Sequence, residues 1–109
     1  MNRGLLQIDA PEALRKLQAG TAWLIDVRER GEVTRAAFDA PHLVQMPLSE
    51  FERRHHELPR DRTLILACAS GGRSGQAMHF LMHHGHAHVC NLQGGIAHWR
   101  VHGLPVTPA

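Results

Sequence analysis

The sequence is poor in cysteine and has no large excess of charge of either sign. Its two cysteines are too few for a disulfide framework, and 12 basic residues against 10 acidic ones leave a formal net charge of +2. That balance gives no reason to expect a nucleic acid or an anionic membrane as a partner. No apolar run approaches the length of a membrane-spanning helix, and residues 1–4 lead into no long apolar segment of a signal peptide.

Internal repeats and low-complexity linkers are also absent. With 109 residues, of which 43% are hydrophobic, the chain has the size and apolar content of one domain that needs no cross-links. We therefore expect residues 1–109 to form a single domain. The low cysteine count and the lack of a signal peptide favour a soluble protein of the reducing cytoplasm.

Short apolar runs alternate with helix-like segments along the chain. Strands are expected at residues 5–8, 22–27, 43–46, 64–66 and 88–92. The segments between them show helical spacing of apolar residues, with capping boxes expected at Asp9/Glu12 and at Ser49/Glu52. Strands that alternate with helices predict an α/β fold, with about five strands in a mostly parallel sheet and helices on both faces.

One stretch, residues 63–74, combines the features of a reactive thiolate site. A short apolar strand runs into Cys68, two glycines follow, and Arg73 and Ser74 lead into a helix. Ligands of a parallel sheet bind beyond the carboxyl ends of its strands, where Cys68 is expected to lie. Glycines let loop N–H groups converge on an anion, and a helix N-terminus adds a positive dipole end. A cysteine in such a loop ionises easily, and the thiolate is the nucleophile.

A cysteine at the end of a buried strand can also be a small apolar residue of the core. Cys68 taken alone favours the core interpretation. The glycine pair, Arg73 and Ser74 shift the preference to a reactive thiolate, because a core cysteine needs none of these neighbours. We therefore interpret Cys68 as a nucleophile.

Four stretches form a set that spans nearly the whole chain. They are residues 24–29 (LIDVRE), 46–48 (MPL), 68–74 (CASGGRS), and 91–99 followed by 103–106 (NLQGGIAHW and GLPV). In this order they resemble the first signature, the segment before the third helix, the active-site loop and the C-terminal signature of single-domain rhodaneses, the thiosulfate sulfurtransferase-like family. The resemblance implies one rhodanese-like domain over residues 1–109.

Sulfur transfer through a cysteine persulfide is the activity that this resemblance implies. Cys68 would be the catalytic nucleophile and would carry the transferred sulfur. Substrate would be bound by the rest of the loop, namely Ala69, Ser70, Gly71, Gly72, Arg73 and Ser74. Backbone N–H groups of residues 69–73 would hold the extra sulfur, and Arg73 would anchor the loop and favour an anionic donor. Ser74 would cap the helix and donate a hydrogen bond to the sulfur. No cofactor is implied.

The donor implied by the resemblance is thiosulfate or a low-molecular-weight persulfide, and the acceptor is a thiol, or cyanide in an assay. Members that use thiosulfate well often carry a basic residue inside the loop, whereas residues 69–72 are uncharged. A small persulfide is therefore an alternative donor. A sulfur-accepting protein is a further expected partner, and a non-enzymatic or partner-dependent sulfur-relay module is the main alternative function.

The length of the loop bears on another function. Four residues separate Cys68 from Arg73. The related branch of phosphatases and arsenate reductases has five intervening residues, which form a cradle for a tetrahedral oxyanion, whereas a shorter loop suits a single sulfur atom. Phosphatase or arsenate reductase activity is therefore the less favoured alternative.

Other polar and aromatic residues favour structural roles. Asp26 and Arg28 are expected to form an ion pair beside the sheet rather than to act in catalysis. Cys90 lies in an apolar strand and is expected to be a packed thiol, not a redox partner of the nucleophile. Trp99 is expected in the core, and residues 53–56 (RRHH) on a solvated helix face.

Histidines are abundant, with ten in the chain. His79 and His83 are four residues apart on a predicted helix, and His84, His86 and His88 follow, a spacing that can bind a transition metal. The set has no third ligand in a clear motif, and His84 falls on the apolar face of the helix. We therefore expect no functional metal site.

Overall fold

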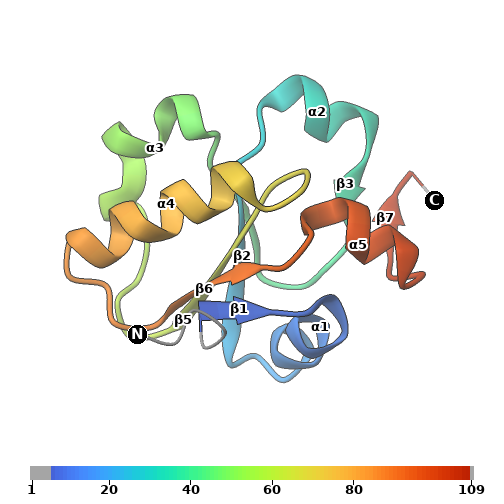
Figure 1. Ribbon diagram of the computed structural model, residues 1–109, viewed down its shortest axis with the longest axis horizontal. Coiled ribbons are helices and arrows are strands. Elements are labelled where there is room, and N and C mark those ends of the chain that lie inside the picture. The colour runs from blue at the N-terminus through green and yellow to red at the C-terminus, as the bar shows by residue number, and fades with distance from the viewer. Residues whose placement is uncertain (1–5, 109) are drawn as a thin grey trace.

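The computed structural model describes residues 6–108, and a five-stranded sheet forms its centre (Figure 1). In spatial order the strands are β1 (Gln7–Ile8), β6 (Val89–Leu92), β5 (Thr63–Ala67), β2 (Ala22–Asp26) and β4 (Leu43–Gln45). Every pairing in this sheet is parallel. The predicted α/β fold is therefore confirmed. Leu5, the first residue of the first predicted strand, lies outside the described residues.

Helices cover both faces of the sheet, as predicted. They are α1 (Ala10–Gln18), α2 (Arg30–Arg35), α3 (Leu48–Arg54), α4 (Gly72–His83) and α5 (Gly95–Val101), with a 3-10 turn at His55–Glu57. Residues of α1 and α5 belong to the core cluster on one face, and residues of α3 and α4 to the cluster on the other (Figure 1). None of the helices described is long and apolar enough to cross a membrane.

Strand β5 contributes side chains to both core clusters. Ile65 and Ala67 pack with α1 and α5, whereas Leu64, Leu66 and Cys68 pack with α3 and α4. Successive side chains of a strand point to opposite faces, so this division follows from the pleat. The alternation places Cys68 on the α4 side of the sheet.

The helix starts differ in how they are capped. At α1 the predicted cap is confirmed, since the Asp9 carboxylate accepts a hydrogen bond from the N–H of Glu12 at 2.9 Å. The Glu12 carboxylate, however, pairs with Arg15 instead of completing the capping box. A complete capping box, which sequence analysis missed, occurs at α2 between Glu29 and Glu32.

The predicted capping box at Ser49 and Glu52 is wrong. Helix α3 begins directly after Pro47 and has no side-chain cap. Its first residue donates its N–H to the carbonyl of Val27 at 2.9 Å, and the Ser49 hydroxyl donates to the Glu29 carboxylate at 2.7 Å. Contacts with the chain after β2 thus set the start of α3.

Residues 53–56 form a solvated face only in part, which corrects the prediction. Arg53 is exposed, but the Arg54 guanidinium forms ion pairs with Glu50 and Glu57, which flank the segment. The His55 ring packs edge-on against the ring of Phe80, with the ring centroids 4.8 Å apart. The segment therefore packs on α4 as well as facing solvent.

A second, antiparallel sheet of two short strands was not predicted. It pairs β3 (Ala37–Phe38) with β7 (Val106–Thr107), and strands of two residues show no periodicity that a sequence pattern can reveal. Trp99 is fully buried beside it, edge-on to Phe38, and its indole N–H donates to the carbonyl of Pro105 at 2.7 Å. The predicted core position of Trp99 is confirmed.

Candidate active site

Cys68 follows β5 at the carboxyl edge of the parallel sheet. The chain then turns through residues 69–71 into α4. Gly71 has a φ of +113°, in the left-handed region that side chains strongly disfavour, so the turn requires a glycine. Cys68 is 1% exposed, and the turn therefore encloses its thiol beside the first turn of α4.

Two hydrogen-bond donors approach the Cys68 sulfur. The N–H of Gly71 lies 3.0 Å and the hydroxyl of Ser74 lies 3.3 Å from Sγ. Burial raises the pKa of the thiol, but hydrogen bonds from the Ser74 hydroxyl and from the backbone N–H groups of residues 74, 71 and 70 outweigh burial. They hold the pKa of Cys68 below its usual range. The loop can therefore stabilise negative charge on this sulfur.

Arg73 is paired with a carboxylate of α2. Its guanidinium makes two hydrogen bonds of 2.7 Å to Glu32. These bonds lower the pKa of Glu32 to about 2 and raise that of Arg73 above its usual range. Arg73 thus connects the start of α4 to α2, and the carboxylate of Glu32 neutralises its charge. Sequence analysis missed Glu32, although its spacing from Glu29 was the signal of a capped helix start.

Ser74 is fully buried in the first turn of α4. It is not the predicted helix cap, because Gly71 occupies the N-cap position. Its hydroxyl approaches both the Cys68 sulfur and Oδ1 of Asn91 in β6, the latter at 2.6 Å. Sequence analysis placed Asn91 in the C-terminal stretch of the family resemblance but gave it no role.

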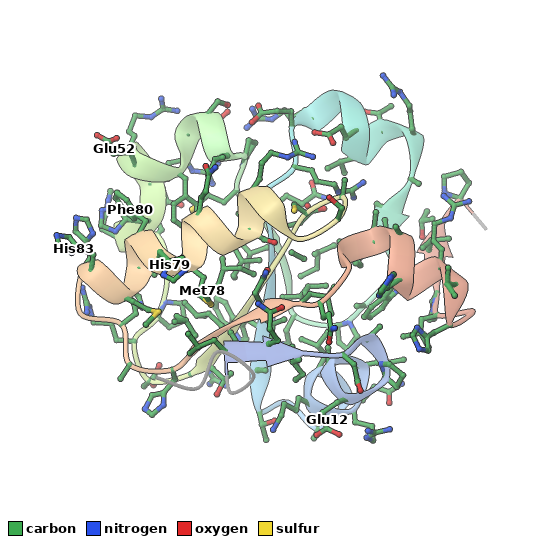
Figure 2. The ribbon with its side chains drawn as sticks, in the orientation of Figure 1. Glu12, Glu52, Met78, His79, Phe80 and His83 are labelled. Atoms are coloured by element: carbon green, nitrogen blue, oxygen red, sulfur yellow. The ribbon has the colours of Figure 1, made fainter. Side chains whose placement is uncertain are left out.

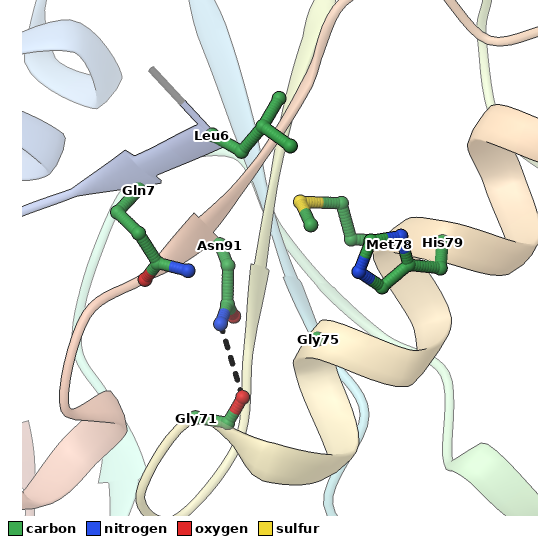
Figure 3. Close-up of a pocket in the computed structure, with 7 residues that line it drawn as sticks. All are labelled: Leu6, Gln7, Gly71, Gly75, Met78, His79 and Asn91. Carbon is green, nitrogen blue, oxygen red and sulfur yellow. Dashed lines mark hydrogen bonds between the residues drawn. The ribbon is translucent and has the colours of Figure 1, made fainter. Parts of the chain in front are cut away.

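A cavity of about 290 Å³ lies beside the cysteine loop, between β1 and α4 (Figure 3). Its lining residues are Leu6, Gln7, Gly71, Gly75, Met78, His79 and Asn91. The Asn91 amide reaches across one end of it and donates to the Gly71 carbonyl at 3.0 Å. Asn91 and Gly71 therefore line the cavity and also belong to the hydrogen bonds around Cys68, Gly71 directly and Asn91 through Ser74.

The predicted ion pair between Asp26 and Arg28 is confirmed. Nη2 of Arg28 lies 2.9 Å from Oδ2 of Asp26, and the backbone N–H of Arg28 donates to the same carboxylate at 3.0 Å. The two side chains are 0% and 4% exposed, and the guanidinium lies over the ring of Phe38. The pair thus connects the end of β2 to β3.

Cys90 lies on the face of the sheet opposite to Cys68. It packs against the cluster of α1 and α5, and burial raises the pKa of its thiol to about 11. Both cysteines are free. This agrees with the predicted packed thiol, since the sheet separates Cys90 from the cysteine loop.

The histidines of α4 belong to no group of three metal ligands in the part of the chain that the structure describes. His79 and His83 project from this helix on successive turns (Figure 2). Within residues 6–108, no three or more His, Cys, Asp or Glu side chains are arranged to hold a metal ion. The expectation of no metal site stays a prediction.

The start of α5 packs directly on the cysteine loop. The N–H groups of Ile96 and Ala97 donate to the carbonyls of Cys68 and Ala69 at 2.9 and 3.2 Å. Gly95 has a φ of +56°, and a Cβ at this position would lie 2.3 Å from the Cys68 carbonyl oxygen. The close contact therefore depends on glycine.

Gly95→Ala should lower the free energy of unfolding by about 3 kcal/mol, since left-handed strain and overpacking each cost about 1–3 kcal/mol. Urea unfolding followed by circular dichroism measures the change. Gly31→Ala is the control, because a Cβ there meets nothing within 4 Å, and helix propensity predicts an unchanged or slightly higher stability. A loss below about 1 kcal/mol for Gly95→Ala would contradict the argument.

Comparison with known proteins identifies relatives over most of the chain. The sequence model of the Rhodanese-like domain matches residues 9–102. A sulfurtransferase of Allochromatium vinosum is 40% identical over 83 residues, which are 76% of this chain and 76% of that protein. The uncharacterized protein YqhL of Bacillus subtilis is 36% identical over 81 residues, which are 72% of this chain and 60% of that protein. These matches support sulfur transfer as the chemistry of the family.

Solved structures show the same fold. The crystal structure of a rhodanese-related protein from Thermoplasma volcanium superposes with a TM-score of 0.83 and 28% sequence identity. The superposition covers 94% of this chain and 98% of that one. The likeness therefore extends over nearly the whole arrangement of sheet and helices described above.

Proposed function

The chain belongs to the rhodanese-like domain family, and from that membership we propose that it is a sulfurtransferase that carries a sulfane sulfur on Cys68. The observation that carries the proposal is the enclosed Cys68 thiol, with the Gly71 N–H at 3.0 Å and the Ser74 hydroxyl at 3.3 Å from its sulfur. We assign the binding of the transferred sulfur to residues 69–74, chiefly through the backbone N–H groups of residues 69–73.

Two displacements at sulfur make up the proposed cycle. The Cys68 thiolate attacks the sulfane sulfur of the donor, a new S–S bond forms, and the donor's own bond to that sulfur breaks. The remainder leaves with the electron pair, as sulfite from thiosulfate or as a thiolate from a persulfide. An acceptor thiolate, or cyanide, then attacks the outer sulfur and releases Cys68 as a thiolate. Neither displacement needs an external oxidant, reductant or cofactor.

The charges of the loop favour a persulfide donor. Arg73 is the only charged side chain among residues 69–74, and it is bound to Glu32. A dianion such as thiosulfate gains less from a guanidinium already neutralised by a carboxylate than from a free one. We therefore expect a low-molecular-weight persulfide to load Cys68 faster than thiosulfate at equal concentration.

Intact-mass spectrometry of the full chain tests this function. The protein is mixed with thiosulfate, or separately with glutathione persulfide, and then with cyanide. We expect a mass gain of one sulfur that maps to the Cys68 peptide, forms faster with the persulfide, and disappears as thiocyanate is released. The absence of a gain with both donors, or a gain that maps elsewhere, would contradict the proposal.

A partner-dependent sulfur relay is the second candidate. Its supporting observation is the 1% exposure of Cys68, because an acceptor thiol must then reach into the loop, as a thiol on a protruding segment of a protein can. Loading followed by slow release to small thiols would favour the relay. The four-residue loop gives no support to a phosphatase. A cytoplasmic location and a single domain over residues 1–109 stay predictions.

A further inference from the structure

A closed set of hydrogen bonds joins Cys68 to Asn91, through the buried Ser74 on one side and the half-buried Gly71 on the other. The Ser74 hydroxyl lies 3.3 Å from the Cys68 sulfur and 2.6 Å from Oδ1 of Asn91. Nδ2 of Asn91 donates to the Gly71 carbonyl (Figure 3), and the N–H of the same glycine donates to the sulfur. Cys68, Ser74 and Asn91 are 1%, 0% and 5% exposed, so bulk water does not compete for the two hydrogen bonds of the Ser74 hydroxyl.

The orientation of the Asn91 amide decides where the Ser74 hydroxyl points. The Gly71 carbonyl can only accept a hydrogen bond, so the NH2 group of Asn91 faces it and the amide oxygen faces Ser74. Two oxygens 2.6 Å apart require a proton between them, and only the Ser74 hydroxyl can supply it. While Cys68 is a neutral thiol, the hydroxyl proton therefore lies on the bond to Asn91 and Ser74 turns a lone pair toward Cys68. The hydrogen bond from Ser74 to the sulfur, which lowers the pKa of Cys68, forms when that proton leaves Asn91 for the thiolate.

This arrangement suits a neutral thiol and opposes a thiolate. The S–H of Cys68 can donate to the Ser74 lone pair, whereas a thiolate facing the same lone pair is repelled. To stabilise the thiolate, the hydroxyl proton must turn to the sulfur, which leaves the buried Oδ1 of Asn91 without a donor. Asn91 and the Cys68 thiolate therefore compete for one proton.

We propose that Asn91 is a positioning residue that holds the Ser74 hydroxyl proton away from Cys68 in the thiol and persulfide states and yields it when negative charge develops on the Cys68 sulfur. In the cycle of the proposed function, on which this timing rests, the charge develops when the acceptor removes the outer sulfur. The competition itself concerns the ionisation of Cys68 and is measurable without any sulfur transfer.

The other charges near Cys68 are the same in every variant of the test. Arg73 of α4, its partner Glu32 of α2 and the neighbouring Glu29 are charged groups at the loop, and no variant changes them. The core cluster that contains Cys68 also draws apolar side chains from β2, β5, α3 and α4. A change in the ionisation of Cys68 in these variants therefore reports on Ser74 and Asn91.

The rate of alkylation by iodoacetamide as a function of pH reports the thiolate fraction of Cys68. It is measured on the full chain carrying Cys90→Ala, so that only one thiol reacts. Asn91→Leu removes the competing oxygen, and we expect the pKa of Cys68 to fall by about one unit, which is about tenfold more thiolate at a pH below the pKa. Ser74→Ala removes the donor and should raise the pKa.

The double variant separates this role from a merely structural one. With Ser74→Ala already present, Asn91→Leu should no longer lower the pKa of Cys68, because no hydroxyl proton is left to release. An equal shift in both backgrounds, or no shift when Ser74 is present, would overturn the proposal. Thermal unfolding checks that each variant folds. If Asn91→Leu does not fold, Asn91→Ala takes its place, because it removes the same amide group. If the variants show the expected shift in the pKa of Cys68 but the wild-type protein takes up no sulfur, only the proposed function is refuted.

Discussion

Cys68→Ser should lower the rate of sulfur transfer by more than about a thousandfold and abolish persulfide formation. A serine hydroxyl is not ionised near neutral pH and cannot form an S–S bond. The substitution changes one enclosed atom and leaves the shape of the side chain nearly unaltered, so the fold should persist. Thiocyanate release from a persulfide donor and cyanide measures the rate, and intact mass measures the loading.

Cys90→Ser is the matched control, because it makes the same substitution in the same chain. Cys90 lies across the sheet, and burial raises the pKa of its thiol to about 11, so it contributes little thiolate at neutral pH. Transfer should stay close to the wild-type rate. Activity retained in Cys68→Ser and lost in Cys90→Ser would reverse the assignment of the nucleophile.

Asp26→Ala should lower the free energy of unfolding by about 3–5 kcal/mol. The substitution leaves the Arg28 guanidinium buried at the end of β2, with that residue 3% exposed and without its carboxylate. A charge in that position is neither hydrated nor paired, and its desolvation is uncompensated. Urea unfolding at neutral pH, followed by circular dichroism, measures the loss.

Arg15→Ala provides the comparison on the surface. Arg15 pairs with Glu12 on α1, but its side chain is 65% exposed, so water screens the pair. The expected change is below about 0.5 kcal/mol. If Asp26→Ala were as mild as Arg15→Ala, the pair between Asp26 and Arg28 would not be the stabilising contact that its burial implies.

The sheet and the cysteine loop were predictable from the sequence because their signals are local. Each strand is a short apolar run, and the helical segments between the strands imply crossovers that return the chain in the same direction. One run ends at Cys68, with two glycines soon after. No knowledge of distant contacts was needed to place this thiol at the carboxyl edge of a parallel sheet.

The hydrogen-bond partners of the loop residues were not predictable, because these partners come from distant parts of the chain. Glu32 and Arg73 are 41 residues apart, and Ser74 and Asn91 are 17 apart. The wrong capping box at the start of α3 has the same cause, since a tertiary contact takes the serine hydroxyl that the local pattern assigned to the helix. Local signals thus locate the proposed nucleophile, whereas its hydrogen bonds depend on the folded topology.

The contact of α5 with the cysteine loop bears on how the protein responds to charge. The carbonyls of Cys68 and Ala69 are bound by the N–H groups of Ile96 and Ala97. In a trans peptide the C=O and N–H point in opposite directions, so the N–H groups of Ala69 and Ser70 point away from α5. Their dipoles are therefore oriented by folding, before a sulfur atom reaches the loop, and need not rotate when negative charge appears. Solvent dipoles would have to reorganise at that moment, whereas this preorganised loop should keep the reorganisation energy of the proposed sulfur transfer small.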